Sequence, residues 1–220
     1  MGRSKLDKFR DNQARRNIIQ PGKEIFEKIK GNWNRVLFKN KNPISLELAC
    51  GKGEYTVGFA RIFPGRNIVG VDIKGSRIWK GSGIAENEGL RNAAFLRAQI
   101  QNLEQYFEED EVDEIWITFP DPRPRLRDER RRLTHPRFLN IYRRILKKGG
   151  WVHLKTDDDQ LFAYSLDVVS ESDFVSNLEY TFDLYKSSLM EHHFGIKTTY
   201  EKRFLEENIP IKYLKFKITG

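Results

Sequence analysis

One stretch decides the fold: Ile44–Gly53, which reads ISLELACGKG. Its first half is a short apolar run that favours a buried strand, and Gly51-Lys52-Gly53 predicts a glycine turn. Residues 54–63 carry apolar side chains at roughly helical spacing, and Pro64-Gly65 ends that helix. A strand, a Gly-x-Gly turn and a helix in this order predict a nucleotide-binding opening.

The same alternation continues along the chain. Apolar runs predict further strands at residues 67–72, 93–97, 113–119, 151–156 and 211–218. Between them, the patterns predict helices at residues 74–89, 136–147 and 159–170, and a helical turn at 103–107. Strands that alternate with helices indicate an α/β fold with a mostly parallel sheet covered by helices on both faces. We expect one domain over residues 31–220.

Composition narrows the functional classes. The 220 residues carry a formal net charge of +8, which favours a polyanionic partner. Cys50 is the only cysteine, so no intramolecular disulfide can form, and no apolar run is long enough to span a bilayer. We therefore expect a cytoplasmic protein without a membrane partner. Residues 1–30 are polar and basic, and they are expected to form a flexible arm that helps to hold nucleic acid.

Acidic residues around the glycine turn indicate the kind of cofactor. The dinucleotide pattern G-x-G-x-x-G is incomplete, because Thr56 stands where the third glycine would be. Asp72 ends the next strand, where an acid would bind ribose hydroxyls. Glu47 and Glu54 bracket the turn, which suits a cationic cofactor such as S-adenosylmethionine better than NAD. The alternative is that Glu47 only forms a local cap or pair.

A second unusual stretch is the segment 119–133, FPDPRPRLRDERRRL, which follows the strand at 113–119. Three prolines within five residues stop the strand and give the chain a stiff path. Asp121 therefore lies just beyond the carboxyl end of a strand, where ligands bind in open α/β sheets. An acid beside many guanidinium groups indicates chemistry on a polyanion, although a solvated charged loop is the simpler alternative.

Three motifs in a fixed order resemble the bacterial tRNA (guanine-N7)-methyltransferases. They are Phe-Pro-Asp-Pro with its arginine run, Lys155-Thr156-Asp157, and Thr198-Thr199-Tyr200-Glu201. The similarity extends from about Leu46 to the C-terminus. It implies a Rossmann-like methyltransferase fold with a seven-stranded sheet. It also implies methyl transfer from S-adenosylmethionine to N7 of the guanine at position 46, in the variable loop of tRNA.

The resemblance also assigns residues to roles, together with the glycine turn and the arginine run. Asp121 is expected to be catalytic. The expected cofactor-binding residues are Glu47, Gly51, Gly53, Asp72, Gln99 and Asp121. The expected substrate-binding residues are Arg123, Arg125, Arg127, Arg130, Arg131, Arg132, Asp157, Thr198, Thr199, Tyr200 and Glu201. Two positions depart from the family pattern: Arg123 replaces a tryptophan, and Gln99 replaces an acid that would hold the adenine end of the cofactor.

The chemistry of N7 suggests how Asp121 acts. N7 has a free lone pair, so we expect Asp121 to orient the base and to stabilise the positive charge of the product rather than to serve as an obligatory base. His192-His193 lacks partners at metal-ligand spacing, so no metal is expected. The alternatives are a methyltransferase for another RNA or for protein, a non-catalytic RNA-binding module, and a nicotinamide oxidoreductase. Either a monomer or a homodimer is compatible with the sequence.

Overall fold

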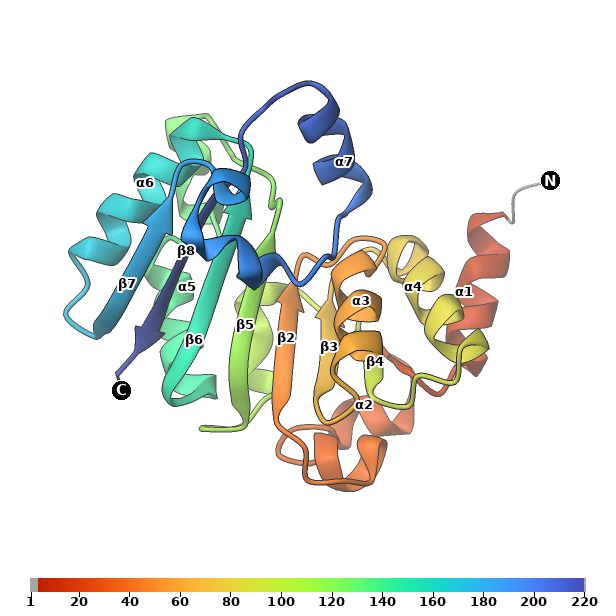
Figure 1. The fold of residues 1–220 in the computed structure, drawn as a ribbon. Coiled ribbons are helices and arrows are strands. Elements are labelled where there is room, and N and C mark those ends of the chain that lie inside the picture. Colours follow the sequence, from red (N-terminus) through yellow and green to blue (C-terminus); the bar gives the residue numbers. More distant parts are fainter. Residues whose placement is uncertain (1–3, 220) are drawn as a thin grey trace.

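The sheet organises the molecule. A computed structural model describes residues 4–219, and within them eight strands form one sheet in the order β1-β4-β3-β2-β5-β6-β8-β7 (Figure 1). The strands are β1 (Ile18–Ile19), β2 (Ile44–Leu48), β3 (Asn67–Val71), β4 (Ala93–Leu96), β5 (Val112–Thr118), β6 (Leu146–Thr156), β7 (Val175–Thr181) and β8 (Lys212–Ile218). Strands β1 to β6 pair in parallel, and β8 runs antiparallel to β6 and β7.

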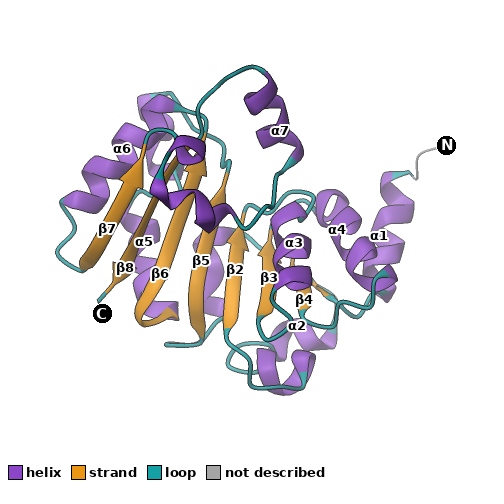
Figure 2. Cartoon of the chain, in the orientation of Figure 1, coloured by secondary structure: helices purple, strands orange, loops and turns teal. Residues whose placement is uncertain are grey.

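Helices cover both faces of this sheet, as Figure 2 shows. They are α1 (Lys5–Ala14), α2 (Glu24–Lys28), α3 (Glu54–Ile62), α4 (Gly75–Asn87), α5 (Pro136–Ile145), α6 (Asp159–Ser170) and α7 (Thr199–Glu206), with a π-helical turn at Trp33–Phe38. One buried cluster joins the sheet to α3 and α4, and the other joins it to α5 and α6. None of the helices in the described part of the chain is long and apolar enough to cross a membrane.

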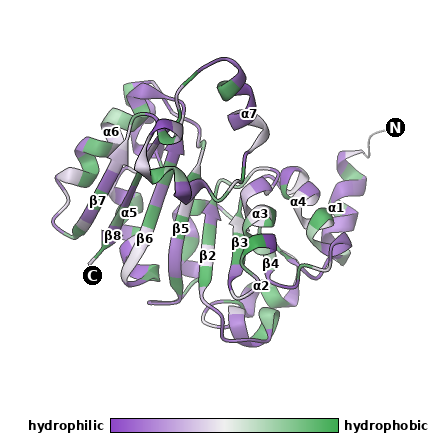
Figure 3. Ribbon diagram, in the orientation of Figure 1, coloured by the Kyte–Doolittle hydropathy of each residue, from purple (hydrophilic) through white to green (hydrophobic). Residues whose placement is uncertain are grey.

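Burial on both faces explains why the central strands read as continuous apolar runs. All five residues of β2 and of β3 are buried, and Figure 3 shows the hydrophobic residues along these two strands. Strands covered on both sides lack the polar alternation of a half-exposed sheet. The predicted α/β architecture is therefore confirmed.

The strand count differs from the expected seven. The additional strand is β1, whose Ile18 and Ile19 pair with Phe95 and Leu96 of β4. It lies in the basic N-terminal arm, whose residues 4–30 form α1, β1 and α2 on the domain. Two residues are too short for a sequence pattern to reveal a strand. Residues 1–3 of that arm lie outside the described part of the chain, and its flexibility stays a prediction.

The topology places a ligand-binding crevice. From β2 the chain proceeds through β3 and β4 on one side of the sheet, whereas β5 and β6 lie on the other side. The strand order therefore reverses between β2 and β5. In open α/β sheets, ligands bind outside the carboxyl ends of the strands at this point. Helix α7 stands above that end of the sheet (Figure 1).

Candidate functional site

The glycine turn after β2 has the backbone that only glycine adopts readily. Gly51 and Gly53 have φ values of 55° and 71°, in the left-handed region. A Cβ on Gly53 would collide with the ring of Phe95, so this position also needs the space. The backbone N–H of Gly53 donates to the carbonyl of Cys50 at 2.8 Å, which closes the turn. The result is a tight connection into the N-terminus of α3.

Glu47 lies beneath this turn and joins two elements. Its side chain accepts hydrogen bonds from the backbone N–H of Thr56 (2.8 Å), from the Thr56 hydroxyl, and from the Thr118 hydroxyl (3.0 Å). The residue is only 2% exposed, and burial raises the pKa of its carboxyl to about 7 despite these hydrogen bonds. Glu47 therefore holds α3 and β5 together, and a cationic ligand beside it would favour the ionised form.

Asp72 and Gln99 follow the carboxyl ends of the neighbouring strands β3 and β4. The Asp72 carboxylate accepts from the backbone N–H of Gly51 at 3.0 Å and of Lys74 at 2.7 Å. It therefore lies against the glycine turn, and its predicted role in binding ribose hydroxyls stays a prediction. Gln99 is exposed beyond β4, and its Oε1 accepts from the Gln101 amide at 2.7 Å. An amide at this edge remains free to exchange that neighbour for a ligand.

The loop that carries Asp121 begins in a constrained backbone. Phe119 has a φ of 49° and Arg123 a φ of 51°, both uncommon for residues other than glycine. The Phe119 N–H still donates to the carbonyl of Lys155 on β6 at 2.8 Å. Asp121 is well exposed, and its carboxylate pairs with the Arg123 guanidinium at 3.1 Å. Arg123, in place of the expected tryptophan, thus contacts the predicted catalytic group.

The arginines after Asp121 fall into two groups. Arg125, Arg127, Arg130 and Arg131 are exposed along a 3₁₀ helix at Leu126–Arg131. Arg132 is buried, and its guanidinium donates to the carbonyl of Arg123 at 3.2 Å and 3.3 Å. Arg132 thus holds the loop in this conformation, whereas the exposed group is available to phosphates.

The predicted substrate segment 198–201 forms the start of α7. Thr198 caps the helix by accepting from the N–H of Glu201 at 3.1 Å. Thr199 donates its N–H to Glu54 at 3.0 Å, and its hydroxyl donates to the same carboxylate. Tyr200 is exposed and Glu201 is fully buried. Asp157, half-buried after β6, lies at the same end of the sheet, and burial raises its carboxyl pKa.

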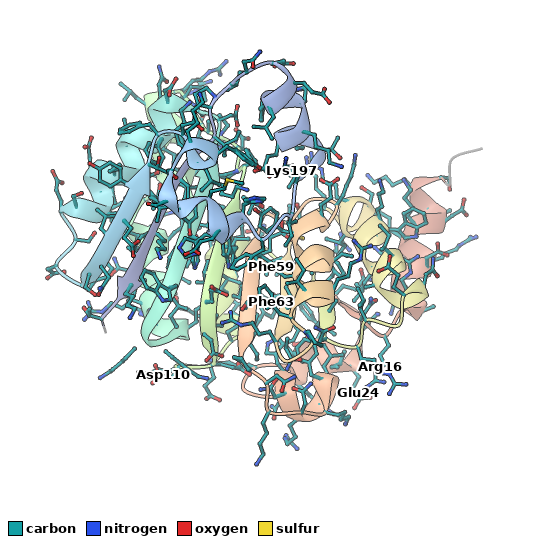
Figure 4. The ribbon with its side chains drawn as sticks, viewed as in Figure 1. Arg16, Glu24, Phe59, Phe63, Asp110 and Lys197 are labelled. Carbon is teal, nitrogen blue, oxygen red and sulfur yellow. The ribbon has the colours of Figure 1, made fainter. Side chains whose placement is uncertain are left out.

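Phe59 and Phe63 line the side of α3 that faces β5, below the segment that carries Lys197 into α7 (Figure 4). The Phe59 ring centroid is 5.0 Å from that of Trp116 on β5, and Phe194 packs against both phenylalanines. This aromatic cluster covers the sheet next to the site with apolar surface. Within residues 4–219, no group of three or more His, Cys, Asp or Glu side chains could hold a metal ion.

Comparisons with known proteins agree with this geometry. A family described as putative methyltransferase matches residues 41–214. A tRNA (guanine-N(7)-)-methyltransferase from Cytophaga hutchinsonii is 48% identical over 98% of both chains, and one from Bacteroides fragilis is 41% identical over 98% of this chain and 86% of its own.

This chain belongs to the tRNA (guanine-N7)-methyltransferase family.

Solved structures of more distant proteins share the fold of this family. The 16S rRNA methyltransferase KamB superposes with a TM-score of 0.61 at 15% identity, covering 84% of this chain and 91% of its own. A 16S rRNA methyltransferase from Catenulisporales acidiphilia, solved with the cosubstrate SAM, gives a TM-score of 0.57 at 11% identity, with 86% and 91% covered. At these identities the likeness concerns the Rossmann-like fold alone.

For this family member, the structure adds residues that the motifs did not reveal. Thr56 and Thr118 fix Glu47, and Glu54 binds Thr199 instead of remaining free beside the glycine turn. Lys155 is buried beneath the site. The motif Lys155-Thr156-Asp157 drew attention to this position, but it did not indicate that the Lys155 side chain would be buried.

Proposed function

We propose that this chain transfers a methyl group from S-adenosylmethionine to N7 of a guanine in tRNA, at position 46 of the variable loop. The observation that carries the proposal is the placement of Glu47, Asp72 and Asp121 around the reversal of strand order, in a chain 48% identical to a tRNA (guanine-N(7)-)-methyltransferase. A cytoplasmic location follows from this role as a further prediction, as does a monomeric or homodimeric state.

The residues at the glycine turn suit this methyl donor. Asp72 presents a carboxylate that can accept from ribose hydroxyls, and its neighbour Ile73 is 49% exposed, which offers apolar surface. The turn lacks a third glycine and has acids where a pyrophosphate would need positive charge. When bound, S-adenosylmethionine would supply a methyl group on a positively charged sulfur. Glu47, Gly51, Gly53 and Gln99 complete the proposed cofactor residues.

The protein groups act on charge and orientation. Attack by the N7 lone pair on that methyl group would form a carbon–nitrogen bond at the expense of the carbon–sulfur bond and would leave the base positively charged. The Asp121 carboxylate can stabilise that charge, and it can also accept from the N1 and N2 donors of the base. Its pairing with Arg123 keeps the carboxylate in place before the base arrives. Alignment of the two reacting atoms supplies much of the rate.

Charged side chains on two elements can hold the tRNA. The exposed Arg125, Arg127, Arg130 and Arg131 can bind phosphates, and Tyr200 on α7 can stack on a base. Asp157, Thr198 and Thr199 belong to the same proposed surface, and Glu201 is buried beneath it. The base must leave its stack to reach Asp121, as in other enzymes that modify a base inside a folded nucleic acid.

A direct assay tests the proposal. Unmodified tRNA transcripts with guanine or adenine at position 46 are incubated with labelled S-adenosylmethionine. We expect label only in the guanine transcript, and cleavage of that transcript in alkali after borohydride reduction. Label in both transcripts would show that the methylated nucleotide is not the guanine at position 46. Binding of tRNA without any transfer would favour a non-catalytic RNA-binding module, and transfer only to other RNA or to protein would overturn the substrate.

A further inference from the structure

Beneath the proposed site lies an ion pair that the methyl transfer itself does not use. The Lys155 ammonium is 2.5 Å from Glu201 Oε1, and the side-chain exposure of both residues is 0%. The hydroxyl of Tyr55 accepts from the same ammonium at 2.6 Å, and the hydroxyl of Tyr185 donates to Glu201 at 2.8 Å. Burial lowers the pKa of Lys155. Burying two charges is costly, and apolar residues of similar size would often be at least as stable.

The pair joins three elements that must be aligned for the reaction. Lys155 lies near the end of β6, and its carbonyl accepts from Phe119, two residues before Asp121. Its ammonium lies 5.8 Å from the centre of the Phe119 ring and contacts Tyr55, which follows Glu54 at the start of α3. Its ionic partner Glu201 lies in the first turn of α7. The loop of Asp121, the helix α3 that follows the glycine turn (called the cofactor helix below) and α7 therefore meet at one ammonium group.

A second, independent contact fixes the same helix. Glu54 accepts from both the N–H and the hydroxyl of Thr199, one residue into α7. The helix has only eight residues, and Glu201 is its only buried one; Phe204, 5.9 Å from Phe119, and Leu205 are partly buried. Directional polar contacts, rather than buried apolar area, therefore determine where α7 lies.

We propose that Lys155 and Glu201 are positioning residues: their buried pair holds α7 against the cofactor helix and the Asp121 loop, and Glu201 acts through Lys155 rather than by touching tRNA. This inference rests on the proposed function. It explains why the buried side of α7 carries a charge while Tyr200, Lys202 and Arg203 on the same helix are exposed. The exposed side has the aromatic and cationic groups that bind nucleic acid.

Three variants test the pair: Lys155→Met, Glu201→Gln and the double variant. Kinetics with tRNA at saturating S-adenosylmethionine should show kcat/KM reduced about tenfold or more in each single variant, mainly through KM. Cofactor affinity measured by calorimetry should change less than about threefold. The kcat/KM of the double variant should be no lower than that of the less active single variant, because both substitutions break the same contact. Additive losses would instead indicate a direct contact of Glu201 with tRNA and would overturn the inference.

Lys215→Met is the matched control. Lys215 is also a nearly buried lysine on the same sheet face, paired with Glu179 at 3.2 Å. Its other partners among residues 4–219 are His192 and Trp151, and neither of them lies on α3 or α7. Hydrogen exchange in a peptide covering residues 199–206 should accelerate at least about tenfold in the Lys155 and Glu201 variants, and not in Lys215→Met. Unchanged exchange and kinetics in folded Glu201→Gln, which is nearly isosteric, would show that the pair is merely structural.

Failure of this inference differs from failure of the proposed function. If the wild-type chain transfers no methyl group to tRNA, the proposed function fails, whatever the variants do. If the wild type is active and the variants match it, only the positioning role fails. If Lys155→Met does not fold, Glu201→Gln alone decides between the two outcomes.

Discussion

At the scale of single residues, charge and burial determine what each acid can do. Asp121 is exposed and paired with an arginine, whereas Glu47 is buried and bonded to two threonine side chains. Both were predicted from sequence as site residues, Glu47 because it lies beside the glycine turn and Asp121 because it follows the carboxyl end of a strand. Their different surroundings could not be predicted, since these depend on Thr118 and Arg123 folding back onto them.

The Asp121 carboxylate should contribute to the rate more than to cofactor binding. We expect Asp121→Asn to lower kcat by about 10- to 100-fold, because the amide keeps the shape but loses the negative charge opposite the methylated base. Single-turnover methylation at saturating tRNA and S-adenosylmethionine measures this loss of rate. As the control, the affinity for S-adenosylmethionine measured by calorimetry should change little. Near-normal turnover of the variant would rule out charge stabilisation.

The buried Glu47 carboxyl should make stability depend on pH. Its pKa is about 7 in the fold against 4.5 for the free side chain. Between these values the unfolded chain loses the proton while the folded chain keeps it, so the free energy of unfolding falls as pH rises and levels off above pH 7. The total change is about 3 kcal/mol. Urea denaturation from pH 4 to pH 8 should show that the free energy of unfolding falls more steeply with pH in wild type than in Glu47→Gln. Parallel dependence on pH in the two proteins would contradict the prediction.

At the scale of elements, the sequence predicted best where burial leaves a simple pattern. Apolar runs were sufficient to predict β2, β3 and β5. Helical periodicity was sufficient to predict α3, α4, α5 and α6. Strand β7 was missed because its residues are half-exposed and mixed in character. Helix α1 was missed because it is almost entirely polar. The Glu54–Thr199 contact spans 145 residues of sequence, so no local pattern could indicate it.

The 3₁₀ segment after Asp121 should bind phosphates by charge. We expect the double variant Arg127→Ala/Arg130→Ala to weaken tRNA binding and to reduce the slope of log K against log salt concentration by about 2, because each lost phosphate contact retains about one counterion. Filter binding at salt concentrations from about 50 to about 300 mM measures the slope. Arg35→Ala, in the turn at the opposite end of the sheet, is the control (Figure 1). Equal slopes in all three proteins would contradict a phosphate-binding role.

At the scale of the whole molecule, residues 4–30 contain a strand that joins the edge of the sheet. Ile18 and Ile19 are fully buried, and Asn17 and Ile19 accept from the backbone of Phe95 and Arg97. In α1, Asp11 accepts from the Trp79 indole at 2.7 Å. The sequence predicted only a basic arm here, because the composition of this segment indicates its charge but not that two of its residues pair with the edge of the sheet.

Removing this segment should destabilise the domain. We expect deletion of residues 1–22 to lower the free energy of unfolding by about 4 kcal/mol, since two isoleucines leave the core and β4 becomes an open edge. Urea denaturation measures the change. Lys5→Ala/Arg10→Ala removes two exposed charges and keeps β1, so its stability should stay near that of wild type. A deletion variant of unchanged stability would support the flexible arm expected from the sequence.

The position of β8 between β6 and β7 has a consequence for biosynthesis. Strand β7 pairs with no strand but β8 among residues 4–219, and the chain reaches β8 only after it has made α7. On the ribosome, the part of the sheet that contains β1 to β6 can assemble early, while β7 must wait without a paired neighbour. Residues 212–218 then enter between two strands already made. We therefore expect the nascent chain to be prone to aggregation during this interval, until β8 has entered the sheet.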